Sequence, residues 1–252
     1  MPRPLRLILP GVAAHIRQRG NNKAACFVED ADRLVYLAQL RELCKTLDCA
    51  LHAYCLMTNH VHLLLTPVSI AACSSLMRDL GQRYVQYFNR RHKRTGTLWE
   101  GRYRSSVVES AHYVFACYRY IELNPVDAGM VQHPSAYLWS SYAANSGMRA
   151  DPSLSPHVEY LGLASDAEKR HASYRALLEQ RLDEALRRAI REALDGGYPL
   201  VSDGFKTAVI DPLGRKTAPG KPGPRRNSGS DPELGKQNSG SDPDLFSAGG
   251  AS

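Results

Sequence analysis

The sequence predicts an α+β fold in which helices pack on one face of a small antiparallel sheet. The first observation is the order of the expected elements over the first 145 residues: strand, helix, strand, strand, helix, strand, helix. The second is that the apolar spacing changes between that of strands and that of helices. The third is a short polar connection, Thr58-Asn59, between two apolar runs, which is typical of antiparallel neighbours.

Residues 12–19 are expected to form the first strand, which ends at a Gly-Asn-Asn turn signal. Asp30 is the expected N-cap of a helix over residues 31–46, because the apolar residues there follow helical spacing. Two apolar runs, 50–57 and 61–65, then supply two strands.

A second helix is expected to begin at Ser69 or Ala71 and to run to about residue 89. A basic stretch and an extended segment rich in β-branched and aromatic residues follow it. A third helix begins near Ser110 and must stop by Asn124, because the proline that follows disfavours helical geometry in the residue before it. Together these elements predict a ferredoxin-like α+β domain.

The chain changes character after about residue 150. We expect one domain over residues 1–150, a helical and basic extension over 151–226, and a disordered tail over 227–252. Within the extension, residues 165–194 are rich in Ala, Leu, Glu and Arg and are expected to be helical, ending at a Gly-Gly pair. The tail carries the motif NSGSDPEL and its near copy NSGSDPDL, whose polar composition is typical of disorder.

Charge and cysteine usage narrow the class of protein. The formal net charge is +7, and residues 227–252 contain one lysine and four acidic residues, so the remainder carries +10. A basic body favours an anionic partner such as nucleic acid, although a basic enzyme without such a partner has the same balance. The six cysteines show no CxxC pair, which indicates reduced thiols in a cytoplasmic protein. No apolar run reaches the roughly 18 residues that a membrane span needs, so no membrane association is expected.

His60, Val61 and His62 lie at the start of an expected strand. Side chains two residues apart on a strand point to the same face, so both imidazoles can face one metal ion while Val61 packs on the other side. Two imidazoles make a partial metal site that needs a further ligand or water. A histidine pair at this spacing also fits a purely structural role.

Tyr120 and Asn124 are expected on the third helix, four residues apart. At about 100° per residue, their side chains lie within about 40° of each other and can reach one point in space. Tyr118 lies about 160° around the helix from Tyr120, so the two tyrosines cannot serve the same site. Aromatic residues on a helix are usually core, and the chain has 13 tyrosines, so a core role is the alternative.

Basic and aromatic residues alternate between the second and third expected helices. Arginine and lysine can neutralise phosphates, and tryptophan can offer a stacking face to an unpaired base. The alternative is a solvated cationic surface over an aromatic core. The candidate DNA-binding residues are Arg83, Arg90, Arg91, Lys93, Arg94, Trp99, Arg102 and Arg104.

Three segments resemble the REP-associated tyrosine transposases, a group of single-tyrosine transposases in the HUH endonuclease superfamily. These segments are LHAYCLMTNHVHLLLTP (51–67), TGTLWEGRYRSS (95–106) and CYRYIELNPVDAGMV (117–131). Two others, QRGNNKAACF (18–27) and YLWSSYAA (137–144), fit the same pattern, so the resemblance covers about residues 5–145. It implies a ferredoxin-like fold, in agreement with the order of the elements.

The resemblance also implies an activity. Tyr120 would be the nucleophile, and His60, His62 and Asn124 would bind a divalent ion, Mg²⁺ or Mn²⁺. The implied substrate is single-stranded DNA with a hairpin structure, which is cut through a 5′-phosphotyrosine intermediate and rejoined. His15, on the first expected strand, has no assigned role.

Two other functions stay open. A relative that has lost catalysis would bind hairpin DNA without cutting it. A metal-dependent hydrolase would use the histidine pair with a water nucleophile, but it leaves the tyrosine motif and the basic segment unexplained. Some members of the resembled group exchange the tyrosine helix between subunits, so the sequence leaves monomer and homodimer undecided.

Overall fold

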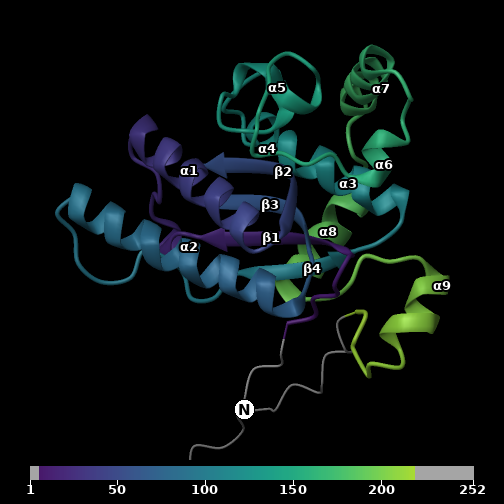
Figure 1. The fold of residues 1–252 in the computed structure, drawn as a ribbon, viewed down its shortest axis with the longest axis horizontal. Helices are drawn as coiled ribbons and strands as arrows, with labels where there is room; N and C mark the ends of the chain where they lie inside the picture. Colours follow the sequence, from purple (N-terminus) through teal and green to yellow (C-terminus); the bar gives the residue numbers. More distant parts are fainter. Residues whose placement is uncertain (1–5, 219–252) are drawn as a thin grey trace, which may run out of the picture. The chain divides into compact units, whose positions relative to one another are not determined.

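A four-stranded antiparallel sheet forms the centre of the domain (Figure 1). The computed structural model describes residues 6–218. The strands lie in the order β2-β3-β1-β4, and each neighbouring pair is antiparallel. This is the ferredoxin-like order, so the predicted fold class is confirmed. The strands are β1 (Ala13–Arg19), β2 (Cys49–Met57), β3 (His60–Pro67) and β4 (Arg104–Val108).

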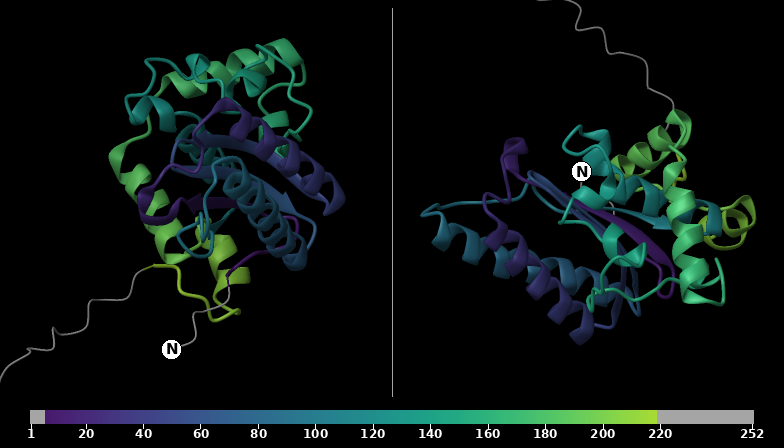
Figure 2. Two further views of the ribbon diagram at one scale, coloured as in Figure 1. Left: turned by 90° about the vertical axis from the view of Figure 1, so that its left-hand side faces the viewer. Right: turned by 90° about the horizontal axis from the view of Figure 1, so that it is seen from above.

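Two long helices, α1 (Asp30–Thr46) and α2 (Ile70–Arg91), cover one face of the sheet (Figures 1 and 2). Alternate residues of the strands point toward these helices, because successive side chains of a strand face opposite sides of the sheet. Removing this apolar surface from water is the main stabilising contribution to the layer. The buried residues that form this first core include Ile16, Tyr36, Leu40, Val61, Leu63, Leu76, Leu80 and Tyr84.

The opposite face of the sheet is also covered. Helix α3 (Ala111–Glu122) packs there with α8 (Glu184–Gly196), and both contribute to a second core that contains the other set of alternate strand residues. The prediction of helices on one face holds for α1 and α2, but the third predicted helix, α3, lies on the other face, where later residues complete a second layer. The remaining described helices are α4 (Asn124–Asp127), α5 (Tyr142–Asn145), α6 (Val158–Leu161), α7 (Ala167–Glu179), α9 (Asp203–Phe205), η1 (Asn21–Lys23), η2 (Pro134–Ala136) and η3 (Lys206–Ile210).

The helix ends follow their capping residues. Helix α2 begins at Ile70, between the two predicted starts, because the Ser69 side chain accepts a hydrogen bond from the Ala72 backbone N–H and caps the helix. Helix α1 begins one residue earlier than predicted, since Glu29 rather than Asp30 is its N-cap and forms a reciprocal capping box with Asp32.

The prediction of one helical stretch over 165–194 is wrong in one respect. The chain forms two helices, α7 and α8, because Asp183 accepts a hydrogen bond from the Leu186 backbone N–H and starts a new helix. The predicted glycine end is confirmed, since Gly197 closes α8 with φ 70° and ψ 30°, a left-handed conformation that glycine adopts without strain.

Both edge strands of the sheet pair with later parts of the chain. At the β2 edge, the Leu56 backbone N–H donates to the Trp139 carbonyl at 2.9 Å. At the β4 edge, the Leu200 backbone N–H donates to the Val107 carbonyl at 2.7 Å. Residues 6–218 accordingly belong to one compact unit, which includes most of the extension that the sequence separates at residue 150. The predicted disordered tail, 227–252, lies outside the described residues.

The described residues bear on two predictions, reduced cysteines and the absence of a membrane-spanning helix. All six cysteines are buried and unpaired, in agreement with reduced thiols. Within residues 6–218, no helix combines the length and the apolar character that crossing a membrane requires.

A buried carboxylate links α3 to two later helices. Glu122 accepts hydrogen bonds from the hydroxyl of Ser141 at 2.5 Å, the amide of Asn145 at 2.8 Å and the hydroxyl of Tyr174 at 2.6 Å. Burial raises the pKa of Glu122 to about 7, and the three donors oppose that shift. Residues from α5 and α7 are thus fixed to the helix that carries Tyr120.

We expect Tyr174→Phe to lower the free energy of unfolding by about 2 kcal/mol, because it removes one donor from a buried carboxylate. The matched control is Tyr118→Phe. Tyr118 is equally buried and contacts Tyr174 ring to ring at 5.7 Å, but its hydroxyl does not bond to Glu122. Urea denaturation of both variants measures the difference, and equal losses would contradict a role for the Glu122 contact.

Candidate active site

The two strand histidines lie side by side on the sheet face that α3 covers. In the register of β3 with β1, His60 lies opposite Arg19 and His62 lies opposite Arg17. The imidazole centroids are 5.0 Å apart with an interplanar angle of 85°. Val61 points to the other face and joins the first core, as the alternation of the strand predicts.

Tyr120 lies against this histidine pair. Its ring centroid is 5.6 Å from that of His62 in an edge-on arrangement, and the residue is 8 % exposed. Tyr118 points away and contacts Tyr160 and Tyr174, which agrees with the helical spacing of the two tyrosines. Histidine and tyrosine therefore come together within one chain, with no residue from a second subunit.

Asn124 also reaches the site, although by a different route from the one expected. Helix α3 ends at Glu122, and Asn124 is the first residue of α4 rather than part of the tyrosine helix. Leu123 between them has φ −87° and ψ −3°, so the chain keeps its right-handed turn across the break. The Asn124 side chain lies close enough to His60 to oppose the lowering of the His60 pKa, so the fourth predicted residue lies beside the first.

Both strand histidines are in the state that binds a metal ion. Burial lowers the pKa of His60 to about 4 and the pKa of His62 well below its usual value, so both rings are neutral at pH 7. His60 Nδ1 lies 2.6 Å from Asn59 Oδ1, and His62 Nδ1 lies 2.9 Å from His15 Nε2. Where Nδ1 donates to its partner, Nε2 is left as the ligand atom, and such partners fix metal-binding imidazoles in place. The residues present therefore fit a divalent ion.

Charged residues from two parts of the chain surround Tyr120. Burial raises its pKa, while Arg17 on β1 and Arg191 and Arg187 on α8 lower it. Arg17 in turn pairs with Asp195 of α8 at 2.5 Å. The extension thus supplies charges to the tyrosine site, and no signal in the sequence could identify that contact.

His15 is the site residue that the sequence left without a role. Its ring lies 5.6 Å from the Tyr120 ring and 5.0 Å from the His62 ring, centroid to centroid, and it is fully buried. Its position depends on the pairing of β1 with β3. The alternation along β1 predicts the face on which His15 lies but not the strand beside it.

A family match covers the residues that build this site. Residues 10–124, somewhat less than half of the chain, match the family described as IS200-like transposases. The matched segment begins just before β1 and ends at Asn124, so it contains all three histidines of the site and Tyr120. Over this segment, the chain is similar to IS200-like transposases.

Two solved structures are similar to the chain. One is a REP-associated tyrosine transposase bound to a REP hairpin, with 13% identity and a TM-score of 0.48, covering 63% of this chain and 93% of the other. The second is a candidate transposase from Deinococcus radiodurans R1, with 21% identity and a TM-score of 0.33, covering 45% of this chain and 91% of the other. No match was found among curated proteins.

The predicted DNA contacts fall on different faces. Five of them lie on α2 or directly after it, on the sheet face opposite Tyr120. Two of these are already paired, Arg83 with Glu42 and Arg91 with Glu29. Arg104 on β4 lies opposite Arg17 and donates to the Asp195 carbonyl, so it belongs to the Tyr120 face, and Arg102 is exposed just before it. The five residues on the α2 side are Arg83, Arg90, Arg91, Lys93 and Arg94.

The prediction that Trp99 stacks on a base does not agree with the structure. Trp99 is 6 % exposed and packs against Tyr36 and Tyr84 in the first core. Its position among basic residues in the sequence could not show that Trp99 is buried, because its burial depends on packing against residues of α1 and α2.

A second group of possible metal ligands, at the start of α1 and the end of α2, has a structural explanation. Glu29, Asp32 and His92 have ligand atoms within 4.8 Å of one another. Asp32 accepts bonds from the Val28 and Glu29 backbone N–H groups, so it caps α1, and it also bonds to His92. Glu29 pairs with Arg91. These contacts join the start of α1 to the end of α2 without a metal ion.

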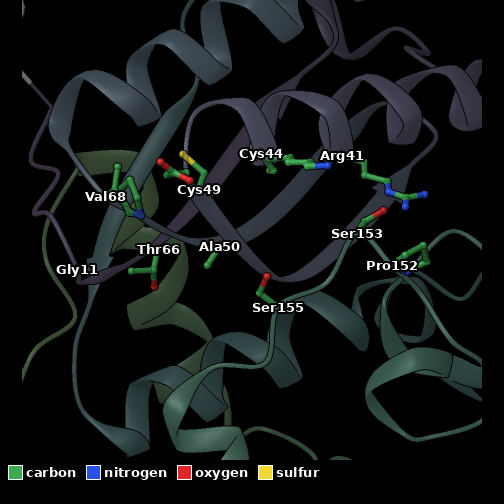
Figure 3. Close-up of a pocket in the computed structure, with 13 residues that line it drawn as sticks. Gly11, Arg41, Cys44, Cys49, Ala50, Thr66, Val68, Pro152, Ser153 and Ser155 are labelled. Atoms are coloured by element: carbon green, nitrogen blue, oxygen red, sulfur yellow. The ribbon is translucent and has the colours of Figure 1, made fainter.

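An open pocket of about 820 Å³ lies away from the tyrosine site (Figure 3). Arg41 and Lys45 of α1, Thr66 near the end of β3, and Ser153 and Ser155 line it. None of the four predicted site residues contributes to it, so the size of a cavity does not identify the catalytic site here.

Proposed function

We propose that this chain is a metal-dependent endonuclease and strand transferase for single-stranded DNA, with Tyr120 as its nucleophile. The observation that supports this most directly is the contact of the Tyr120 ring with His62 in one site of one chain, with Asn124 beside His60. A water-using hydrolase would not need a buried tyrosine beside its metal ligands. The hairpin in the substrate is proposed from the three sequence segments that resemble REP-associated transposases.

In this proposal the Tyr120 hydroxyl oxygen attacks a phosphodiester phosphorus in line. The new bond is a 5′-phosphotyrosine, the bond between phosphorus and the 3′-oxygen breaks, and the leaving oxygen takes up a proton to become a 3′-hydroxyl. The tyrosine proton leaves as the bond to phosphorus forms, and Arg17 favours the developing phenolate because its charge lowers the Tyr120 pKa. Attack by another 3′-hydroxyl reverses these steps and joins two strands.

His60, His62 and Asn124 would hold the divalent ion. When bound, Mg²⁺ or Mn²⁺ would polarise the scissile phosphate and offset its charge. Two imidazoles and one amide supply no net charge, so water and phosphate oxygens would complete the ligand set. The Nδ1 partners of the two histidines, buried His15 and half-buried Asn59, would keep these ligands oriented before DNA arrives.

The cationic residues would bind the DNA backbone on two faces. Arg102 and Arg104 lie next to the tyrosine face and would hold the strand to be cut. The five basic residues on the α2 side would contact phosphates of the folded part of the substrate. Such contacts need positive charge and exposure rather than a fixed pocket.

The test is to map the covalent adduct. The protein is incubated with hairpin-containing single-stranded DNA carrying a 5′ or a 3′ label, with Mn²⁺, with Mg²⁺ or with a chelator. We expect a metal-dependent adduct that retains only the DNA on the 3′ side of the cut, and mass spectrometry of the linked peptide should identify Tyr120. Binding without an adduct would favour a non-catalytic hairpin-binding protein, and cleavage without an adduct would favour a water nucleophile. Either outcome overturns the proposal.

A further inference from the structure

The buried contact between His15 and His62 joins neighbouring strands inside the tyrosine site. In the register of β1 with β3, His15 lies opposite Leu64, so His62 is its diagonal neighbour on the same face. His15 Nε2 lies 2.9 Å from His62 Nδ1, and the two residues are 0 % and 1 % exposed. Solvent therefore cannot replace this hydrogen bond.

We propose that His15 is a positioning residue that selects the metal-binding form of His62. The proposal rests on the assignment of His62 as a metal ligand. A neutral imidazole carries one proton, and its ligand nitrogen must be the bare one. If His62 Nδ1–H donates to His15 Nε2, the Nε2 of His62 is free to bind the ion. If His15 donates instead, His62 carries its proton on Nε2 and cannot bind there.

The second nitrogen of His15 supports this role. In the proposed arrangement His15 carries its proton on Nδ1, and that buried atom has no hydrogen-bond partner among the described residues. Buried polar atoms without a partner are uncommon and oppose folding. A phenylalanine could fill the same space beside Tyr120 without leaving a polar atom unpaired. The histidine is therefore explained by its Nε2 acceptor rather than by packing.

The His15 ring contacts two functional parts of the site. It lies edge-on to Tyr120 at 5.6 Å and tilted to His62 at 5.0 Å, so one side chain contacts both the nucleophile and a metal ligand. The opposite residue on β4 is Ser106, whose hydroxyl donates to the Tyr198 carbonyl and not to His15. No competing polar group in this part of the structure fixes the His62 ring.

The direct test is nuclear magnetic resonance of ¹⁵N-histidine-labelled protein without added metal. We expect His62 to be protonated on Nδ1 and to show a through-hydrogen-bond coupling to His15 Nε2. Protonation of His62 on Nε2 would overturn the proposal. This measurement uses the wild-type chain and needs no variant to fold.

Variants extend the test to metal binding, measured as free Mn²⁺ by electron paramagnetic resonance. His15→Phe removes the acceptor and should weaken Mn²⁺ binding about 10- to 100-fold, whereas His15→Gln, whose amide oxygen can reach the Nε2 position, should restore most of it. His52→Phe is the matched control. His52 is a buried histidine that bonds to Ser155 and Thr66 outside the site, so its loss lowers stability and should leave Mn²⁺ affinity unchanged.

The outcomes separate this proposal from the proposed function. Unchanged Mn²⁺ affinity in His15→Phe, or a His15→Gln variant as weak as His15→Phe, would overturn the role of His15. Unchanged affinity in a His60→Ala, His62→Ala double variant would instead overturn the metal site itself. The protonation state of His62 in the wild-type chain tests the His15 contact in either case.

Discussion

Tyr120→Phe is expected to abolish the covalent protein–DNA adduct and to lower strand cleavage by more than about 1,000-fold, because it removes the only atom that can form the phosphotyrosine bond. The substitution deletes one hydroxyl and keeps the ring that packs against His62 and His15. Metal binding and the free energy of unfolding should therefore change little. Denaturing gels of labelled DNA and a Mn²⁺ titration measure the two effects separately.

Tyr118→Phe is the matched control for this substitution. It lies two residues away on the same helix and is also buried, but its ring faces Tyr160 and Tyr174. We expect this variant to cleave DNA at the wild-type rate. Equal losses in the two variants would mean that α3 is sensitive to any change, and residual adduct in Tyr120→Phe would place the nucleophile elsewhere.

The fold could be predicted because its strands and helices carry local signals. The alternation along β3 predicts that Val61 enters the core while its neighbours face the other side, and Ser69 marks the start of α2. The second helical layer could not be predicted in the same way. It depends on long-range contacts such as Tyr174 with Glu122, and neither residue has a local pattern that names its partner.

The residues of the candidate site also differ in whether local signals could predict them. His60, His62 and Tyr120 each lie on an element whose periodicity indicates the face of the side chain, and their meeting follows from the packing of α3 on the sheet. His15 needs the register of two strands that are distant in sequence. The prediction for Trp99 is wrong because residues that are neighbours in sequence need not share a surface, and Trp99 is buried in the first core.

Stability should fall as the pH is lowered from 7.5 to 5. Burial lowers the pKa of His15 to about 3 and that of His52 to about 4, and it also lowers the pKa of His157. In the unfolded chain these groups take up protons near pH 6.5, whereas in the folded protein they stay neutral until their lower pKa values are reached. Their contribution to stability is therefore complete above pH 6.5 and is lost as the pH falls toward 3.

Glu122 acts in the opposite direction but cannot offset this loss. Its pKa in the folded protein, about 7, lies above its unfolded value, so its unfavourable ionisation in the folded state is relieved as the pH falls from 7. Each fully buried histidine loses about 2 kcal/mol between pH 6.5 and pH 5, and several histidines outweigh one carboxyl group. His15 and His52 together lose about 4 kcal/mol, Glu122 returns about 3 kcal/mol, and His157 adds to the loss, so the net loss is on the order of 1 to 2 kcal/mol.

Urea denaturation between pH 7.5 and pH 5, with a chelator present, measures this dependence. His52→Gln should be less stable at pH 7.5 but should show a smaller slope with pH, because an amide cannot titrate and His52 lies outside the metal site. A wild-type curve that is flat between pH 7.5 and pH 5 would contradict the neutral state of the buried histidines. That neutral state is also the one in which His60 and His62 could bind a metal ion, so the stability curve tests a condition of the proposed chemistry without any DNA.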